Sequence, residues 1–137
     1  MPPDPLPDMP ELPVPLTLCL FRGERLLFSS QGRWLHPLFE LEEHLEAGGN
    51  PAGTRLLDRV TGRGAALLVV RLGIPELHTG ILSRRAIPVL ERWRVRYTGA
   101  QVVDRIACAT EDLLAGLEDP EAARTLLLER RNRALGR

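Results

Sequence analysis

The chain has 137 residues, of which 44% are hydrophobic and 26% are charged, and 18 basic residues balance 18 acidic ones. A chain of this size can bury one core without a disulfide or a metal. Zero net charge excludes a general attraction to nucleic acids or membrane surfaces, so we expect neither as a partner. All the basic residues are arginines, which excludes lysine chemistry. The two cysteines, Cys19 and Cys108, are too few for a disulfide framework or a four-thiolate zinc site.

Residues 1–15 contain seven of the twelve prolines. Proline fixes φ and donates no backbone hydrogen bond, so the pattern predicts a disordered leader followed by a single domain over residues 16–137. The leader has neither the basic nor the apolar region of a signal peptide. The longest apolar run, residues 65–70, is far too short to cross a bilayer. These features predict a cytoplasmic protein.

The domain is predicted to open with a β-hairpin. Residues 16–21 and 25–30 have strand composition, and Gly23 lies in the short turn between them. A helix is expected next, because Pro37 suits a first helical turn and Gly48 ends the apolar pattern. That helix carries leucines at helical spacing, namely Leu38, Leu41 and Leu45.

The second half alternates between helix and strand signals. Polar residues at 58–64 lead into the apolar run, which predicts a largely buried helix over about residues 58–71. Ser83 is a suitable N-cap for a helix that contains Pro88, and Asp119 is another, followed by Pro120 and an arginine-rich helix. The predicted elements are a strand at 76–83, a helix at 84–93, a strand at 94–99, a helix at 108–117 and a helix from 120 to the C-terminal end.

Strands that alternate with helices predict an α/β fold, here a three-layer α-β-α arrangement with parallel crossovers after the hairpin. In such sheets ligands bind outside the carboxyl ends of the strands. The loops at 52–58, 82–85 and 98–110 would meet at that edge.

The segment DRVTGRGAALL at 58–68, followed by GILS at 80–83, resembles the family known as domain of unknown function 1893. The spacing of Cys108 and Glu111, and the Asp119-Pro120-Glu121 helix start, also fit that family. The resemblance covers about residues 16–123. It implies a fold similar to the cytidine deaminases, with a mixed sheet of about five strands and helices on both faces. The family's basic positions are usually lysines, whereas this chain has Arg59 and Arg63 there, and residues 104–111 replace its glycine-rich stretch.

A zinc deaminase needs an H-x-E or C-x-E motif at one helix start and P-C-x-x-C at the next. The two predicted helix starts carry Asp58-Arg59-Val60 and Ser83-Arg84-Arg85 instead. His44-Leu45-Glu46 matches the first motif by its letters, but it lies at the end of a predicted helix and no P-C-x-x-C follows it. We therefore expect no metal and no cofactor.

The charged helix start is open to two interpretations. In the first, Arg59 and Arg63 lie on one helix face and bind an anionic or nucleotide-like small molecule together with Ser83 and Glu111, while Asp58 orients an arginine or meets a base or ribose. In the second, Asp58 caps the helix and the arginines pair with acids inside the protein. The first interpretation requires Asp58, Ser83 and Cys108 to surround one hollow.

Two further functions follow from other residues. Cys108 near a helix start could be a nucleophile, with Asp58 or Glu111 as the base, although a small buried cysteine is the simpler reading. The chain could instead be a noncatalytic interaction module that forms a homodimer through leucines of the C-terminal helix.

Overall fold

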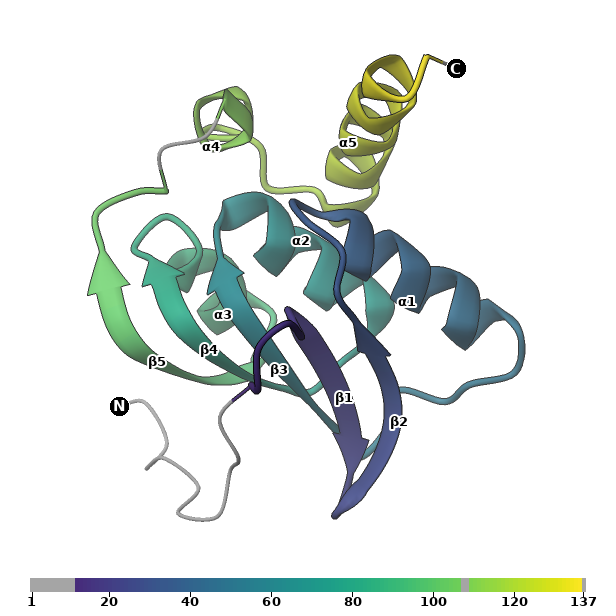
Figure 1. Cartoon of the computed structure of the whole chain (residues 1–137). Helices are drawn as coiled ribbons and strands as arrows, with labels where there is room; N and C mark the ends of the chain where they lie inside the picture. Colours follow the sequence, from purple (N-terminus) through teal and green to yellow (C-terminus); the bar gives the residue numbers. More distant parts are fainter. Residues whose placement is uncertain (1–11, 107–108, 137) are drawn as a thin grey trace.

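Five strands form one mixed sheet in the computed structural model, which describes residues 12–106 and 109–136. β1 runs antiparallel to β2 and to β3, whereas β3, β4 and β5 are parallel (Figure 1). The predicted opening hairpin and mixed five-stranded α/β sheet are therefore confirmed. The order in the sheet is β2 (Arg25–Ser30), β1 (Leu18–Arg22), β3 (Thr54–Thr61), β4 (Glu76–Ser83) and β5 (Arg96–Val103).

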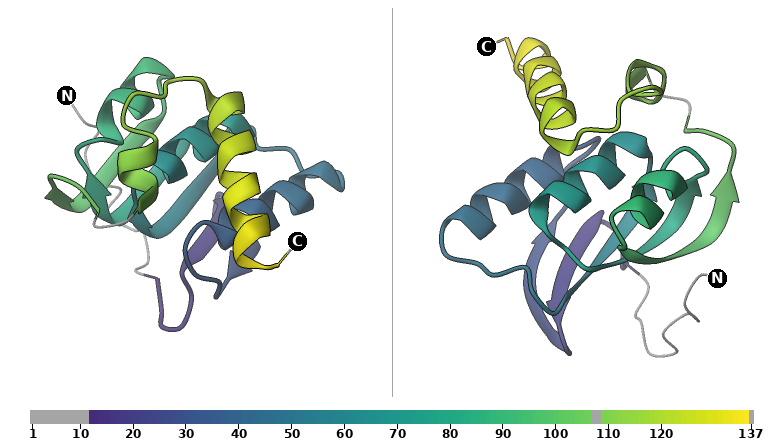
Figure 2. Two further views of the ribbon diagram at one scale, coloured as in Figure 1. Left: turned by 90° about the horizontal axis from the view of Figure 1, so that it is seen from above. Right: turned by 180° about the vertical axis from the view of Figure 1, so that it is seen from behind.

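The helices lie on one face of this sheet in the described part of the chain (Figure 2). α2 contacts all four other helices, and α5 packs across it. Within the described ranges, no helix is both long enough and apolar enough to cross a membrane. The helices are α1 (His36–Glu46), α2 (Arg63–Leu72), α3 (Ile87–Arg92), α4 (Ala109–Leu113) and α5 (Pro120–Ala134).

The expectation of helices on both faces, and hence of three layers, is wrong for the described residues. The reason is the direction in which the chain crosses the sheet. The connections through α1, α2 and α3 join β2 to β3, β3 to β4 and β4 to β5, so each one steps the same way along the sheet. Right-handed crossovers that all step the same way put their helices on the same face.

One core fills the space between the sheet and the helices. Leu56 of β3 is completely buried in it, and alternation along the strand puts Asp58 on the same face. A carboxyl group therefore lies at the border of an apolar core. The fully buried large side chains include Leu18, Leu20, Leu41, Leu56, Leu67, Leu77, Leu82 and Leu90.

The predicted helix start at Asp58 is wrong. Residues 54–61 form β3, and α2 begins at Arg63 after a single connecting residue, Gly62. Gly62 has an extended backbone, with φ −95° and ψ −175°, so the chain passes from strand to helix within one residue. The charged residues before the apolar run are typical of the polar first turn of a helix, but Asp58 and Arg59 lie within a strand that ends at Thr61.

Other boundaries differ less. The predicted strand at 94–99 is shifted to Arg96–Val103, and the helix after Ser83 begins at Ile87 with Pro88 in its first turn. The predicted disorder of the leader falls mostly on residues 1–11, which lie outside the described residues.

Asp119 is the N-cap of α5, as predicted, and its side chain accepts a hydrogen bond from the backbone N–H of Glu121 at 3.2 Å. Replacing Asp119 with Ala should lower the free energy of unfolding by about 1 kcal/mol, because it leaves that N–H without an acceptor. Chemical denaturation of the two proteins measures the difference. Asp119→Ser keeps an acceptor and should retain most of the stability; equal losses for Ala and Ser would contradict the capping role.

Candidate functional site

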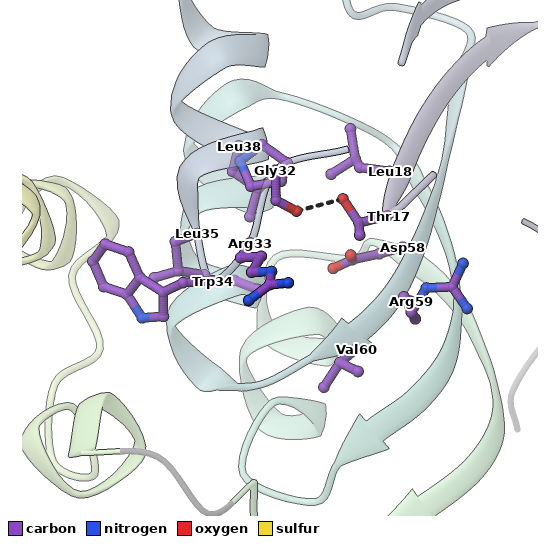
Figure 3. Close-up of a pocket in the computed structure, with 12 residues that line it drawn as sticks. Thr17, Leu18, Gly32, Arg33, Trp34, Leu35, Leu38, Asp58, Arg59 and Val60 are labelled. Atoms are coloured by element: carbon purple, nitrogen blue, oxygen red, sulfur yellow. Dashed lines mark hydrogen bonds between the residues drawn. The ribbon is translucent and has the colours of Figure 1, made fainter. Parts of the chain in front are cut away.

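A pocket of about 200 Å³ lies between the sheet and the first turns of α1 and α2. It opens near the carboxyl end of β3, which is the edge where the sequence predicts a ligand site. Figure 3 shows Asp58 pointing into it. The lining residues are Thr17, Leu18, Gly32, Arg33, Trp34, Leu35, Pro37, Leu38, Asp58, Arg59, Val60 and Ala65.

Asp58 is the acidic group of this pocket. It lies in β3 between Leu18 of β1 and Thr79 of β4. Burial raises the pKa of Asp58 from 3.8 to about 7, although the hydrogen bond from Thr61 acts in the opposite direction. The described residues supply no salt-bridge partner for this carboxyl group. Asp58 can therefore exist in both protonation states near neutral pH, and it can either donate or accept a hydrogen bond.

Two threonine hydroxyl groups form a hydrogen-bonded chain that leads from the carboxyl group of Asp58 into the protein. Thr61 Oγ1 lies 2.9 Å from Asp58 Oδ2 and 3.0 Å from Thr79 Oγ1, and Thr79 Oγ1 lies 3.2 Å from the carbonyl oxygen of Ile81. Thr61 and Thr79 are both buried. The backbone N–H groups of Arg59 and Val60 also bind this carboxyl group, which is directed toward the pocket (Figure 3).

The two arginines of the pocket lie differently. The guanidinium of Arg59 donates to the carbonyl oxygen of Leu16 at 2.6 Å and points away from Asp58 (Figure 3). Arg33 is exposed, and its guanidinium lies among Trp34, Asp58 and Val60. The side chain of Arg33 has no hydrogen bond or ion pair with any residue that the structure describes. Arg33 is therefore the cation available to a ligand at this pocket.

The turn before α1 holds Arg33 and Trp34 at the pocket. Thr17 Oγ1 donates to the carbonyl oxygen of Gly32 at 2.7 Å, which ties the turn to the start of β1. Trp34 has φ 56°, in the left-handed region that residues with a side chain rarely adopt, and it is 38% exposed. Backbone conformations of this kind are concentrated at functional sites.

A second polar cluster surrounds the carboxylate of Glu111, which is only 2% exposed. Its Oε1 accepts the backbone N–H of Arg63, the first residue of α2, at 2.6 Å. Its Oε2 accepts the hydroxyl of Ser83 at 2.9 Å and the N–H of Ile106 at 3.4 Å. A Cβ atom at Gly62 would collide with Oε1 of Glu111. The chain's own carboxylate thus occupies the anion position at the N-terminus of α2.

The guanidinium of Arg63 is also bound within the protein. Its Nε donates to the carbonyl oxygen of Leu114 at 2.8 Å, NH2 donates to that of Leu117 at 2.6 Å, and NH1 donates to that of Arg85 at 3.1 Å. Arg63 itself is buried. These bonds connect the start of α2 to the segment that contains α4, and they leave Arg63 little capacity to bind a ligand.

Comparison with known proteins identifies the family. The family model for the domain of unknown function DUF1893 matches residues 15–128, which is most of the chain. This chain belongs to the DUF1893 family. Among solved structures, it is similar to the crystal structure of a DUF1893 family protein from Thermotoga maritima, with a TM-score of 0.75 and 21% identity over 84% of this chain and 80% of the other. That level of identity supports the shared fold only. No curated protein matches this DUF1893 chain.

The structure of this DUF1893 protein divides the predicted site residues into two groups. Asp58 and Arg59 line the pocket, whereas Ser83 and Glu111 belong to the cluster at the start of α2, together with Arg63. Cys108, the proposed nucleophile, lies outside the described residues. Ser83 is not among the residues that line this pocket, so the hollow predicted around Asp58, Ser83 and Cys108 stays a prediction.

His44 and Glu46 match the first zinc-deaminase motif by their letters, so their position relative to other possible metal ligands matters. Within the described ranges, no group of three or more His, Cys, Asp or Glu side chains is placed to hold a metal ion. His44 is exposed on α1, where its ring lies 5.3 Å from the ring of Phe28. The H-x-E letters therefore lie on the outer part of a helix in this DUF1893 protein, away from the pocket residues.

Proposed function

We propose that this DUF1893 protein binds a small nucleotide-like or other anionic molecule in the pocket around Asp58. The observation that carries the proposal is a half-buried carboxyl group without a cationic partner among the described residues, inside a pocket whose mouth carries the side chain of Arg33, which is also unpaired. Burying an ionisable group without a partner costs free energy, and such groups are concentrated at functional sites.

Asp58 and Arg33 are suited to bind different parts of the ligand. A carboxyl group that donates or accepts a hydrogen bond near neutral pH suits the edge of a heterocycle, which carries adjacent N–H and C=O or ring-nitrogen groups. The Arg33 guanidinium suits a phosphate or carboxylate, which it can bind with two parallel hydrogen bonds. The side chain of Trp34 offers an aromatic surface beside them.

The size of the pocket limits the ligand. Its volume of about 200 Å³ is somewhat larger than a cavity of about 150 Å³ that holds benzene and smaller than typical drug-sized sites. One ring would fill the pocket, and a sugar or phosphate would extend to the mouth, where Arg33 lies.

A thermal-shift screen over nucleosides, nucleotides and phosphorylated metabolites tests the proposal. A hit should raise the melting temperature of the parent protein, and Arg33→Ala should weaken binding of a phosphorylated hit about tenfold or more, as expected for one lost charged hydrogen-bonding partner. Arg84→Ala is the matched control, since Arg84 is exposed, pairs with Asp104 and does not line the pocket. No hit in the screen, or equal weakening by both substitutions, would reject the pocket as an anion site.

We also propose that the family's sheet is of the cytidine-deaminase-like kind. Its support is the mixed five-stranded sheet that opens with a hairpin and continues with three parallel strands. The zinc chemistry of that class is not part of the proposal, because the helix starts at Arg63 and Ile87 carry no ligand motif. A cytoplasmic location stays a prediction from composition.

A further inference from the structure

β5 is an edge strand without the usual protection of an edge. Among the described residues its only neighbour in the sheet is β4. Natural proteins usually protect long edge strands with charges or prolines, because the free edge can pair with another chain. Residues 97–103, Tyr-Thr-Gly-Ala-Gln-Val-Val, contain neither a charge nor a proline. Ala100, Gln101 and Val102 in this stretch are all exposed.

The backbone of β5 has hydrogen-bonding groups available at this edge. The N–H of Arg96 donates to the carbonyl oxygen of Pro75 at 3.0 Å, so the groups of Arg96 are directed toward β4. Successive residues of a strand direct their N–H and C=O groups to opposite sides. Tyr97 and Gly99 therefore direct theirs away from β4, toward solvent. At the far end of β5 the carbonyl oxygen of Val103 accepts the N–H of Arg84 at 2.8 Å, so that group is already bound within the chain.

We propose that β5 pairs antiparallel with β5 of a second copy of this chain, about a twofold axis at Ala100. In this register Ala100 lies opposite itself, Thr98 opposite Val102, and Arg96 opposite Asp104. The two five-stranded sheets would then form one continuous sheet of ten strands. An interface of this kind is isologous, because each copy contributes the same residues.

The charges at the two ends of β5 are complementary in this register. Arg96 pairs with Glu76 at 3.2 Å and is 61% exposed, whereas Asp104 pairs with Arg84 at 3.0 Å and is 94% exposed. Placing Arg96 beside Asp104 of the second copy produces an alternating row of Glu76, Arg96, Asp104 and Arg84. The twofold axis repeats this row at the other end, and opposite charges across paired strands are stabilising.

The small residues at the centre favour a second copy over an unrelated partner. Gly99 and Ala100 lie at the axis, where the two backbones approach most closely, and the charged residues lie at both ends. None of residues 97–103 lines the Asp58 pocket, so the pairing leaves the pocket open and does not depend on the function proposed for it.

Cysteine cross-linking tests this register directly. In a Cys108→Ser parent, Ala100→Cys should form a disulfide-linked dimer under mild oxidation, because facing residues of an antiparallel pair bring two Cβ atoms within disulfide reach. Gln101→Cys should cross-link at least tenfold more slowly, because residue 101 lies opposite Gly99 of the second copy and not opposite the other introduced cysteine. Ser29→Cys, exposed on the other edge strand β2, measures collisions between molecules. Equal rates for the three variants would overturn the proposal.

Charge reversal supplies an independent measurement. Sedimentation of the parent at about 100 µM should give about twice the chain mass of 15.3 kDa. Asp104→Arg should increase the dimer dissociation constant about tenfold or more, since it puts two arginines together at each end. Adding Arg96→Asp to that variant should restore the dimer. A monomeric parent at this concentration, or no recovery in the double variant, would contradict the proposed pairing.

Discussion

Replacing Asp58 with Asn should remove a large part of the pH dependence of folding stability. Burial raises the pKa of Asp58 from 3.8 to about 7, so the folded protein holds this proton more tightly than the unfolded chain does. The stabilisation from the proton is fully present below about pH 4, falls as the pH rises and is lost above about pH 7. A shift of this size corresponds to a change of about 4 kcal/mol across that range.

Comparing the parent protein with Asp58→Asn isolates the contribution of Asp58, because the other carboxylates are present in both proteins. The free energy of unfolding, measured in urea between pH 5 and pH 8, should decrease by about 3 kcal/mol more in the parent than in Asp58→Asn. The Asn variant should be the more stable protein at pH 8, because its amide keeps an oxygen for Thr61 and carries no charge into the pocket. Asp112→Asn, at an exposed carboxylate, serves as the control. Parallel pH curves for the parent and Asp58→Asn would show that Asp58 is solvated.

The local patterns in the sequence were sufficient to predict most elements of the fold. Strand composition around a glycine turn gave the hairpin, and Asp119 followed by proline gave the start of α5. The face on which the helices lie was not accessible in this way, because it depends on the order of strands in the sheet. Once that order is known, the handedness of the crossovers determines the face.

The boundary between β3 and α2 shows how a small error changes a site. Reading residues 58–71 as one helix placed Arg59 and Arg63 on a common face. In the structure a strand ends at Thr61 and a helix begins at Arg63, so the two arginines belong to different elements. A short apolar run with charges before it fits either a helix or a strand followed by a helix, and only Gly62 marks the break.

The site residues that sequence reasoning missed are those whose partners are distant in the chain. Arg33 and Trp34 precede α1 and looked like a connection, because nothing local relates them to Asp58. The hydrogen bond between Glu111 and the N–H of Arg63 joins residues 48 positions apart. The available signal was the pair of glycines at 62 and 64, where a Cβ atom would collide with Oε1 of Glu111 and lie 3.0 Å from Leu114, respectively.

Replacing Glu111 with Ala should cause the largest loss of stability among the substitutions considered. It removes an acceptor shared by the N–H of Arg63, the hydroxyl of Ser83 and the N–H of Ile106, all held around a carboxylate that is 2% exposed. Leaving buried donors without a partner typically costs 1–3 kcal/mol for each group, so we expect a loss of about 3 kcal/mol or more. Urea denaturation of the parent and the variant measures it.

Asp112→Ala is the matched control for this change. Asp112 is the next residue and also binds two arginines, Arg85 and Arg105, but its side chain is 61% exposed. Exposed ion pairs contribute at most about 1 kcal/mol, so the control should lose far less stability than Glu111→Ala. The amide proton of Arg63 should also exchange faster with solvent in Glu111→Ala and not in the control. Comparable losses in the two variants would mean that Glu111 does not hold α2 and α4 together, and would return it to the candidates for ligand contact.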